Sequence, residues 1–156
     1  MNHETYLAKT IELAVENVEK GTGGPFAAII VKNGEIVGIG KNSVTTKNDP
    51  TAHAEVQAIR NACEKLGTFQ LDECVLYSSC EPCPMCFGAI YWARPAGIFF
   101  AGTREDAAAA GFDDEHFYHE IEKPNADRQL KMISLLREEA QRLFQNWIEK
   151  TDKTRY

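Results

Sequence analysis

The first segment of the chain has the apolar spacing of a helix. Between residues 4 and 20 the apolar side chains recur every three or four positions, at Leu7, Ile11, Ala14, Val15 and Val18. This spacing places them on one face of an amphipathic helix. The glycine at position 21 is a residue that commonly ends helices. We therefore expect a helix over residues 4–20 that packs one face against a core.

The next segment has the pattern of a β-hairpin. Two apolar runs rich in β-branched residues, within FAAIIVKNGEIVGIGKN, are joined by Asn33 and Gly34. Asn-Gly readily adopts the positive φ angles that a two-residue hairpin turn requires. The pattern predicts two antiparallel strands.

Four further segments alternate between helical and continuous apolar patterns. Asp49 or Thr51 is a suitable cap for the first of them, and Gly67 is a suitable stop. Near-continuous apolar strands separated by a helix indicate a β-α-β unit whose sheet is covered on both faces. The expected fold class is α/β, with three layers (α/β/α) and a central mixed sheet. The segments are a helix at about 52–66, a strand at 74–79, a helix at about 83–94 and a strand at 97–102.

Beyond residue 103 the periodicity weakens. REDAAAAG, at 104–111, has the composition of a short helical turn, and residues 136–150 have the spacing of an amphipathic helix. A chain of 156 residues suits a single hydrophobic core. We interpret residues 1–156 as one domain.

The composition of the chain indicates where the protein is located and what kind of molecule it binds. The N-terminal stretch MNHETYLAKT lacks the apolar core of a signal peptide, and the longest apolar runs are too short to span a bilayer. Five cysteines, an odd number, suit a disulfide framework poorly. We therefore expect a cytoplasmic protein with no membrane partner. The net charge of −6 disfavours nucleic acid, whose binding depends on Lys and Arg contacts to phosphate, and favours a small substrate.

Three cysteines form two overlapping C-x-x-C pairs in SSCEPCPMCFGAI. Pro82 suits the first turn of a helix after the strand at 74–79, so Cys83 and Cys86 fall three residues apart on one helix face. The exposed N–H groups and dipole of a helix start also stabilise thiolates. Two such thiolates make half of a tetrahedral zinc site, whereas Cys80 lies outside this spacing and is expected to be a small packed residue.

The third ligand is expected from TAHAE. His53 lies at the start of the helix at 52–66, and helix starts gather at the carboxyl ends of parallel strands. Three protein ligands leave a fourth position open, as in catalytic zinc sites. Glu55 and His53 can serve one site only if it lies beyond the helix end, because residues i and i+2 do not share a helix face. Glu55 is then placed to move protons between a zinc-activated water and a substrate.

These motifs resemble a known family. H-A-E at 53–55 followed by P-C-P-M-C at 82–86 matches the H-x-E…P-C-x-x-C signature of the zinc-dependent cytidine and deoxycytidylate deaminases. The order of elements over about residues 5–105 is similar to the cytidine deaminase-like fold, which implies a central mixed sheet of about five strands. The resemblance implies one Zn²⁺ per subunit and hydrolytic removal of an exocyclic amine.

Two subgroups resemble the chain most closely, the bacterial guanine deaminases and the tRNA adenosine deaminases. Both have segments like DPTAHAE and EPCPMC. Tyr91-Trp92 after the cysteine motif, AGFDD at 110–114 and the terminal Tyr156 are similar to the guanine deaminases. This resemblance implies conversion of guanine and water to xanthine and ammonia. Deamination of tRNA adenosine, of cytosine or of a triazine by the same site stays an alternative.

The resemblance also implies substrate contacts. Asn42 would hydrogen-bond to the purine edge, Asp114 would contact ring nitrogens and relay a proton beside Glu55, and Ala54 would present backbone groups. Phe26 and Trp92 would pack on the purine faces, with Trp92 one and a half turns after Cys86. Each of the polar and aromatic side chains also has a purely structural interpretation: core for Phe26 and Trp92, a turn for Asn42, and a solvated loop for Asp114.

The resemblance further implies a homodimer. Its C-terminal arm, residues 123–156, would be exchanged between subunits and would place Tyr156 over the partner's pocket. Two interpretations from other classes remain. A structural zinc module would need a fourth protein ligand, for which Cys80 is the candidate, and a thiol oxidoreductase would use the C-x-x-C pairs but leaves His53 and Glu55 unexplained.

Overall fold

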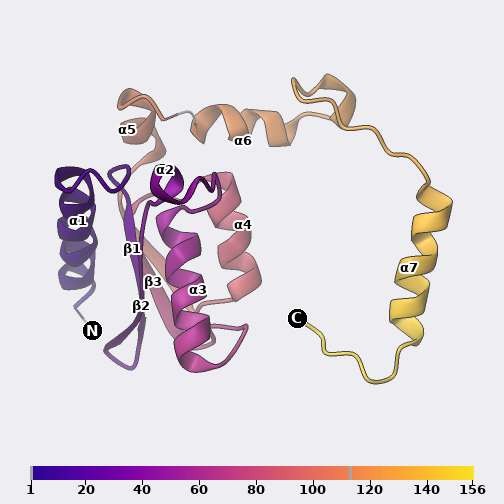
Figure 1. Cartoon of the computed structure of the whole chain (residues 1–156), viewed down its shortest axis with the longest axis horizontal. Coiled ribbons are helices and arrows are strands. Elements are labelled where there is room, and N and C mark those ends of the chain that lie inside the picture. Colours follow the sequence, from indigo (N-terminus) through magenta and orange to yellow (C-terminus); the bar gives the residue numbers. More distant parts are fainter. Residues whose placement is uncertain (1, 113) are drawn as a thin grey trace. The chain divides into compact units, whose positions relative to one another are not determined.

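The computed structural model describes residues 2–112 and 114–156, and its chain divides into two compact units. The first unit spans residues 1–117 and the second spans residues 118–156. Figure 1 shows the order of elements along the chain. Among the described residues, no helix combines the length and the apolar character that crossing a bilayer requires.

A mixed sheet of four strands forms the centre of the first unit. The strands lie in the order β2-β1-β3-β4. β1 is antiparallel to both of its neighbours, and β3 is parallel to β4. The mixed α/β sheet is confirmed, but within the described residues it has one strand fewer than expected. Their bounds are Ala27–Lys32 for β1, Glu35–Lys41 for β2, Cys74–Cys80 for β3 and Gly97–Gly102 for β4.

The hairpin between β1 and β2 turns at the predicted dipeptide. Asn33 has φ of 51° and Gly34 has φ of 83°. Positive φ at both central residues defines the turn that matches the twist of paired strands. The pairing of Lys32 with Glu35 brackets this turn, which sets the register of the two strands.

Helices cover both faces of the sheet (Figure 1). α1 packs on β1 and β3 from one face, while α3 packs on β2 and β1 from the other and also contacts α4. The predicted three layers are therefore present. The bounds are His3–Glu19 for α1, Val44–Lys47 for α2, Ala54–Leu66 for α3, Pro84–Ala93 for α4 and Arg104–Ala109 for α5.

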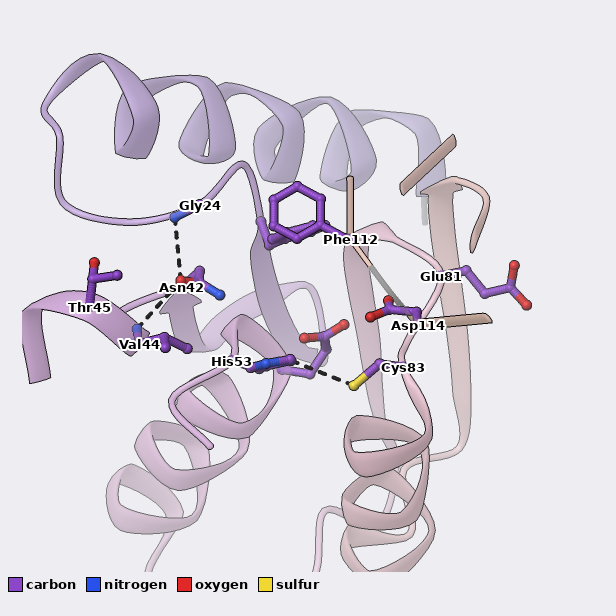
Figure 2. Close-up of a pocket in the computed structure, with 11 residues that line it drawn as sticks. Gly24, Asn42, Val44, Thr45, His53, Glu81, Cys83, Phe112 and Asp114 are labelled. Carbon is purple, nitrogen blue, oxygen red and sulfur yellow. Dashed lines mark hydrogen bonds between the residues drawn. The ribbon is translucent and has the colours of Figure 1, made fainter. Parts of the chain in front are cut away.

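Two of these helices begin beside the same cavity, as Figure 2 shows. His53 is the N-cap of α3 and Cys83 is the N-cap of α4, both with extended backbone. Pro84 occupies the first turn of α4, so it, rather than Pro82, is the proline that opens this helix. The expected caps of α3 serve an earlier turn, in which Asp49 accepts hydrogen bonds from the backbone N–H and hydroxyl of Thr51.

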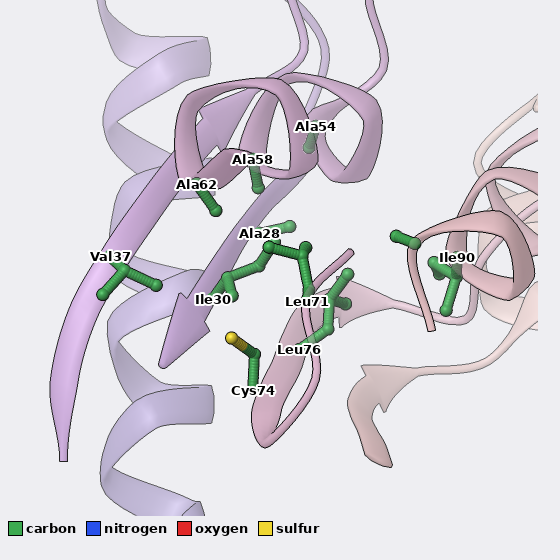
Figure 3. Close-up of a cluster of buried hydrophobic side chains, with 11 residues drawn as sticks. Ala28, Ile30, Val37, Ala54, Ala58, Ala62, Leu71, Cys74, Leu76 and Ile90 are labelled. Carbon is green, nitrogen blue, oxygen red and sulfur yellow. The ribbon is translucent and has the colours of Figure 1, made fainter. Parts of the chain in front are cut away.

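The core is divided by the sheet because successive strand residues face opposite sides. Ala28 and Ile30 of β1 join the cluster beneath α3 and α4, drawn in Figure 3, whereas Ile29 and Val31 join the cluster beneath α1. Glycine allows α3 to lie close to β2. A Cβ on Gly40 would stand 2.0 Å from the carbonyl oxygen of Ala54.

The second unit is helical and presents many apolar side chains. α6 (Asp114–Glu122) crosses the boundary between the units, a short 3-10 turn spans Asn125–Asp127, and α7 spans Arg137–Glu149. α7 was predicted over 136–150. Residues 131–136, which carry an apolar run, form no strand within the described part of the chain. Exposed apolar residues of α7 follow helical spacing: Leu143, Phe144, Trp147 and Ile148.

Candidate metal and catalytic site

The three predicted metal ligands lie together at the starts of α3 and α4. His53 Nδ1 is 3.5 Å from Cys83 Sγ and 3.6 Å from Cys86 Sγ. Tetrahedral zinc, with bonds of about 2.0–2.1 Å to nitrogen and about 2.3 Å to sulfur, separates such ligands by about 3.6 Å. The donor set and its spacing therefore fit zinc. Within the described residues no fourth His, Cys, Asp or Glu joins this group, which leaves a coordination position open.

The two thiols and the imidazole shift one another's pKa values. A hydrogen bond from the Cys86 side chain, with another from His53, lowers the pKa of the Cys83 thiol to about 4. The same interaction with Cys83 raises the pKa of Cys86, and a hydrogen bond with Cys83 raises that of His53. A metal ion binds both sulfurs as thiolates, so its binding would release protons from this site.

Glu55 is buried beside the ligands without being one of them. It is the second residue of α3 and only 6% exposed, and its Oε1 accepts a hydrogen bond of 3.1 Å from Ser78 Oγ. Burial raises the pKa of this carboxyl group. His53 is the N-cap and lies outside the first turn of α3, so the side chains of His53 and Glu55 both reach the same cavity. This is the arrangement predicted for two residues that are two positions apart. A buried carboxyl group there can exchange protons with a bound molecule.

Cys80 is separate from the metal ligands. It ends β3, is buried, and donates a hydrogen bond of 3.6 Å to the carbonyl oxygen of Thr103. Burial raises the pKa of its thiol to about 11. A buried, protonated thiol is a poor ligand and a poor nucleophile. The position fits the packed residue expected from the sequence.

A cavity of about 330 Å³ opens beside the ligands. Phe26 and Phe112 meet edge to face in its wall, with ring centroids 4.7 Å apart. In Figure 2, Asn42 lies on one side of His53 and Asp114 on the other. The full lining is Gly24, Phe26, Asn42, Val44, Thr45, His53, Glu55, Glu81, Cys83, Phe112 and Asp114.

Three residues with predicted substrate contacts, Trp92, Ala54 and Tyr156, are not among the residues that line this cavity. Trp92 is 63% exposed on α4 and is not in the cavity wall, because six residues are about one and two-thirds turns, which points it away from the face of Cys86. The Ala54 side chain belongs to the core, so only its backbone is available to a ligand. Tyr156 ends the second unit and is 67% exposed.

Two residues of the site, Ser78 and Phe112, were not predicted from the sequence. Ser78 binds Glu55, and Phe112 packs on Phe26. The alternation of side chains along the strand at 74–79 predicts that Ser78 lies on the same face as Leu76. It does not predict that Ser78 contacts Glu55. Phe112 lies only two residues before Asp114, so its position in AGFDD was the available signal.

The fold and the site together define a class of protein. Residues 1–102 match the cytidine and deoxycytidylate deaminase zinc-binding region. The chain belongs to this family of zinc-dependent deaminases. The match confirms the family and the metal that the H-A-E and P-C-P-M-C motifs predicted.

Particular relatives are similar over the whole chain. Guanine deaminase of Bacillus subtilis (strain 168) is 55% identical over 156 residues, which is 100% of both chains. The X-ray structure of guanine deaminase from B. subtilis has a TM-score of 0.96 and covers 100% of this chain and 99% of its own. The tRNA-specific adenosine deaminase of Aquifex aeolicus (strain VF5) is 35% identical over 150 residues, 96% of each chain.

Proposed function

We propose that the chain hydrolyses guanine to xanthine and ammonia. The observation that carries this proposal is the 55% identity to a guanine deaminase across the full length of both chains. The similarity to a tRNA-specific adenosine deaminase is lower, at 35%. We therefore propose guanine as the substrate rather than tRNA adenosine, cytosine or a triazine.

The cavity and the charge support a small base as the substrate. About 330 Å³ lies at the lower end of the range for small-molecule pockets, roughly 300–1,000 Å³. The aromatic pair Phe26 and Phe112 offers apolar surface to a planar ring. A net charge of −6 opposes the phosphate contacts on which RNA affinity depends.

In the proposed mechanism Glu55 moves the protons. When bound by His53, Cys83 and Cys86, zinc supplies Lewis acidity, which makes water a competent nucleophile near neutral pH. Glu55 takes a proton from the water that attacks C2 of guanine and gives it to a ring nitrogen. It then delivers the second proton to the departing amine, and ammonia leaves. Ser78 holds Oε1 of Glu55 during these transfers.

Recognition of the base would use the two sides of the cavity. Asp114 would accept hydrogen bonds from ring N–H groups, and it is close enough to His53 to affect the pKa of that histidine. Asn42 would hydrogen-bond to the purine edge, and Phe26 would pack on its face. Both line the same cavity as Glu55. A base whose buried polar groups found no partner here would lose about 1–3 kcal/mol of binding free energy for each such group. These contacts would therefore select guanine over bases with a different edge.

We also propose a homodimer in which the arm 123–156 is exchanged, in line with the exposed apolar residues of α7. α4 presents a second apolar surface through Phe87, Tyr91 and Trp92. Large exposed apolar surfaces mark protein interfaces. A cytoplasmic location is proposed as well, since all five cysteines lie in the described chain and none is disulfide-bonded.

An ammonia-release screen tests the substrate. Purified zinc-loaded protein is incubated with guanine, adenine, cytosine and their nucleosides, and with a tRNA anticodon stem-loop assayed for inosine. We expect ammonia from guanine at a rate far above that from the other compounds. Inosine formation with guanine untouched would replace the proposal with the tRNA alternative.

A further inference from the structure

We propose that Asn17, a buried residue of α1, positions Asn42 so that its amide nitrogen faces the cavity as a hydrogen-bond donor. The inference rests on the proposed role of Asn42 in binding the base. It assigns a substrate-positioning role to a residue of a helix on the other side of the sheet from α3. The effect should appear in substrate affinity, while proton transfer by Glu55 is preserved.

The orientation of the Asn42 amide follows from its neighbours. Oδ1 of Asn42 accepts hydrogen bonds from the backbone N–H of Gly24, at 3.3 Å, and of Val44, at 3.4 Å. Both partners are donors, so the oxygen must face them and the nitrogen must face away. Figure 2 shows this nitrogen turned away from Gly24 and Val44. Asn42 therefore offers donors to a ligand, which selects for an acceptor on the bound base.

Asn17 joins the two backbone segments that hold Asn42 in this orientation. It is 1% exposed, and its Nδ2 donates to the carbonyl oxygens of Gly24 and Asn42, each at 2.9 Å. Its Oδ1 accepts a hydrogen bond of 2.7 Å from Thr22 Oγ1, which fixes the amide in turn. Both donors and an acceptor of a buried amide are thus used to connect the loop after α1 with the end of β2.

The backbone of Gly23 packs closely against this amide and against the Asn42 carbonyl. A Cβ on Gly23 would lie 1.9 Å from the carbonyl oxygen of Asn42 and 2.9 Å from Asn17 Nδ2. Phe26 adds a hydrogen bond between the same segments, since its carbonyl oxygen accepts from the backbone N–H of Asn42 at 3.0 Å. Loss of the Asn17 amide would leave the carbonyl of Asn42 without this buried donor, and the segments could move apart.

The test compares Asn17→Leu, which matches the amide in size, with the milder Thr22→Val. Asn61→Leu is the matched control, because Asn61 Nδ2 also donates to a β2 carbonyl, that of Ile39, on an exposed surface. We expect Asn17→Leu to raise KM for guanine about three- to tenfold, as for one lost positioned hydrogen bond, with kcat and zinc content kept. Thr22→Val should raise KM less, and Asn61→Leu should leave it unchanged.

A double-mutant cycle with Asn42→Ala separates positioning from general destabilisation. If Asn17 acts through Asn42, Asn17→Leu raises KM no further in the Asn42→Ala background. Amide hydrogen exchange of Gly24 and Val44 is the second readout and needs no turnover. Exchange at both should be faster in Asn17→Leu and in Thr22→Val than in the wild type or Asn61→Leu.

The two proposals fail in different ways. A wild-type protein that releases no ammonia from guanine contradicts the proposed function, and hydrogen exchange still decides the role of Asn17. Additive effects of Asn17→Leu and Asn42→Ala on KM would overturn the positioning role, as would unchanged exchange at Gly24 and Val44. If Asn17→Leu does not fold, Thr22→Val carries both readouts.

Discussion

Glu55 combines two properties at the scale of the residue: it lies against the metal ligands, and it is held by a neutral hydroxyl group rather than by a cation. Replacing it with glutamine keeps its size and removes its capacity to carry protons. We expect Glu55→Gln to lower kcat for ammonia release by about 10²- to 10⁴-fold, as for loss of a general acid–base group. Zinc content, measured by atomic absorption, should stay near that of the wild type. Full turnover in this variant would contradict the assignment.

Ser78 is expected to act through Glu55. Hydrogen bonds to charged groups contribute about 1.5–3 kcal/mol, so Ser78→Ala should lower kcat by about tenfold or more and change KM little. Ser79→Ala is the control, because Ser79 Oγ accepts a hydrogen bond from the backbone N–H of Ala27 and makes no contact with Glu55 among those described. Steady-state kinetics on guanine measure both. Equal losses in the two variants would show a general effect on β3 instead.

Cys80 distinguishes an open metal site from a closed structural one. Cys80→Ala should retain its zinc, because the thiol is buried against Thr103 and lies outside the donor group. Cys83→Ala, which removes one of three ligands, should lose most of its zinc after dialysis. Metal analysis of the two purified variants checks this. Equal zinc loss would favour the structural module with Cys80 as a ligand.

Single residues were predictable where the chemistry is local. His53, Cys83 and Cys86 could be selected because helix starts and C-x-x-C spacing are visible in the sequence. Ser78 could not be assigned a partner, since its contact with Glu55 depends on how β3 and α3 pack. Trp92 was expected at the base from the family resemblance; it is exposed on α4, and its contact with the base stays a prediction. The roles of the polar substrate contacts stay predictions.

At the scale of elements, the first turn of α3 packs closely against β2. Gly40 faces the first turn of α3, where a Cβ would lie 2.0 Å from the Ala54 carbonyl oxygen and 2.4 Å from the Ala58 nitrogen. We expect Gly40→Ala to lower the free energy of unfolding by about 1–3 kcal/mol or more, as for overpacking, and to weaken zinc binding by shifting His53. Urea unfolding and metal analysis measure the two effects.

The control for this substitution is another strand glycine. A Cβ on Gly97 of β4 would meet nothing within 4 Å. Gly97→Ala should therefore leave stability unchanged or raise it by up to about 1 kcal/mol, because alanine has less conformational freedom to lose on folding. Similar losses in both variants would mean that the contact with α3 is not the cause.

Elements were the most predictable level of the structure. Helical and strand periodicity placed α1, α3, α4 and α7 within a few residues of their observed ends, and Asn33-Gly34 located the hairpin turn. The fifth strand was expected from the fold resemblance. It has no counterpart in the described residues, where the sheet contains four strands. Pairing over long distances is the part that local patterns do not determine.

At the scale of the whole molecule, the exposed apolar residues of α7 would be buried in the proposed dimer. We expect Leu143→Glu combined with Trp147→Glu to convert a dimer into monomers, because each charge would be buried in the proposed interface. Gln141→Glu, on a polar position of the same helix, should leave the mass unchanged. Sedimentation or light scattering measures the mass. A wild-type protein that is already monomeric would contradict the exchanged arm.

The imidazole and the two sulfurs come from different helices, α3 and α4, which a bound ion would cross-link. Because the unfolded chain lacks this arrangement, the free energy of ion binding adds to that of folding. Scarcity of the metal would then do more than stop turnover: it would enlarge the unfolded fraction that proteases attack. The steady-state amount of this protein in a cell would accordingly follow the supply of zinc.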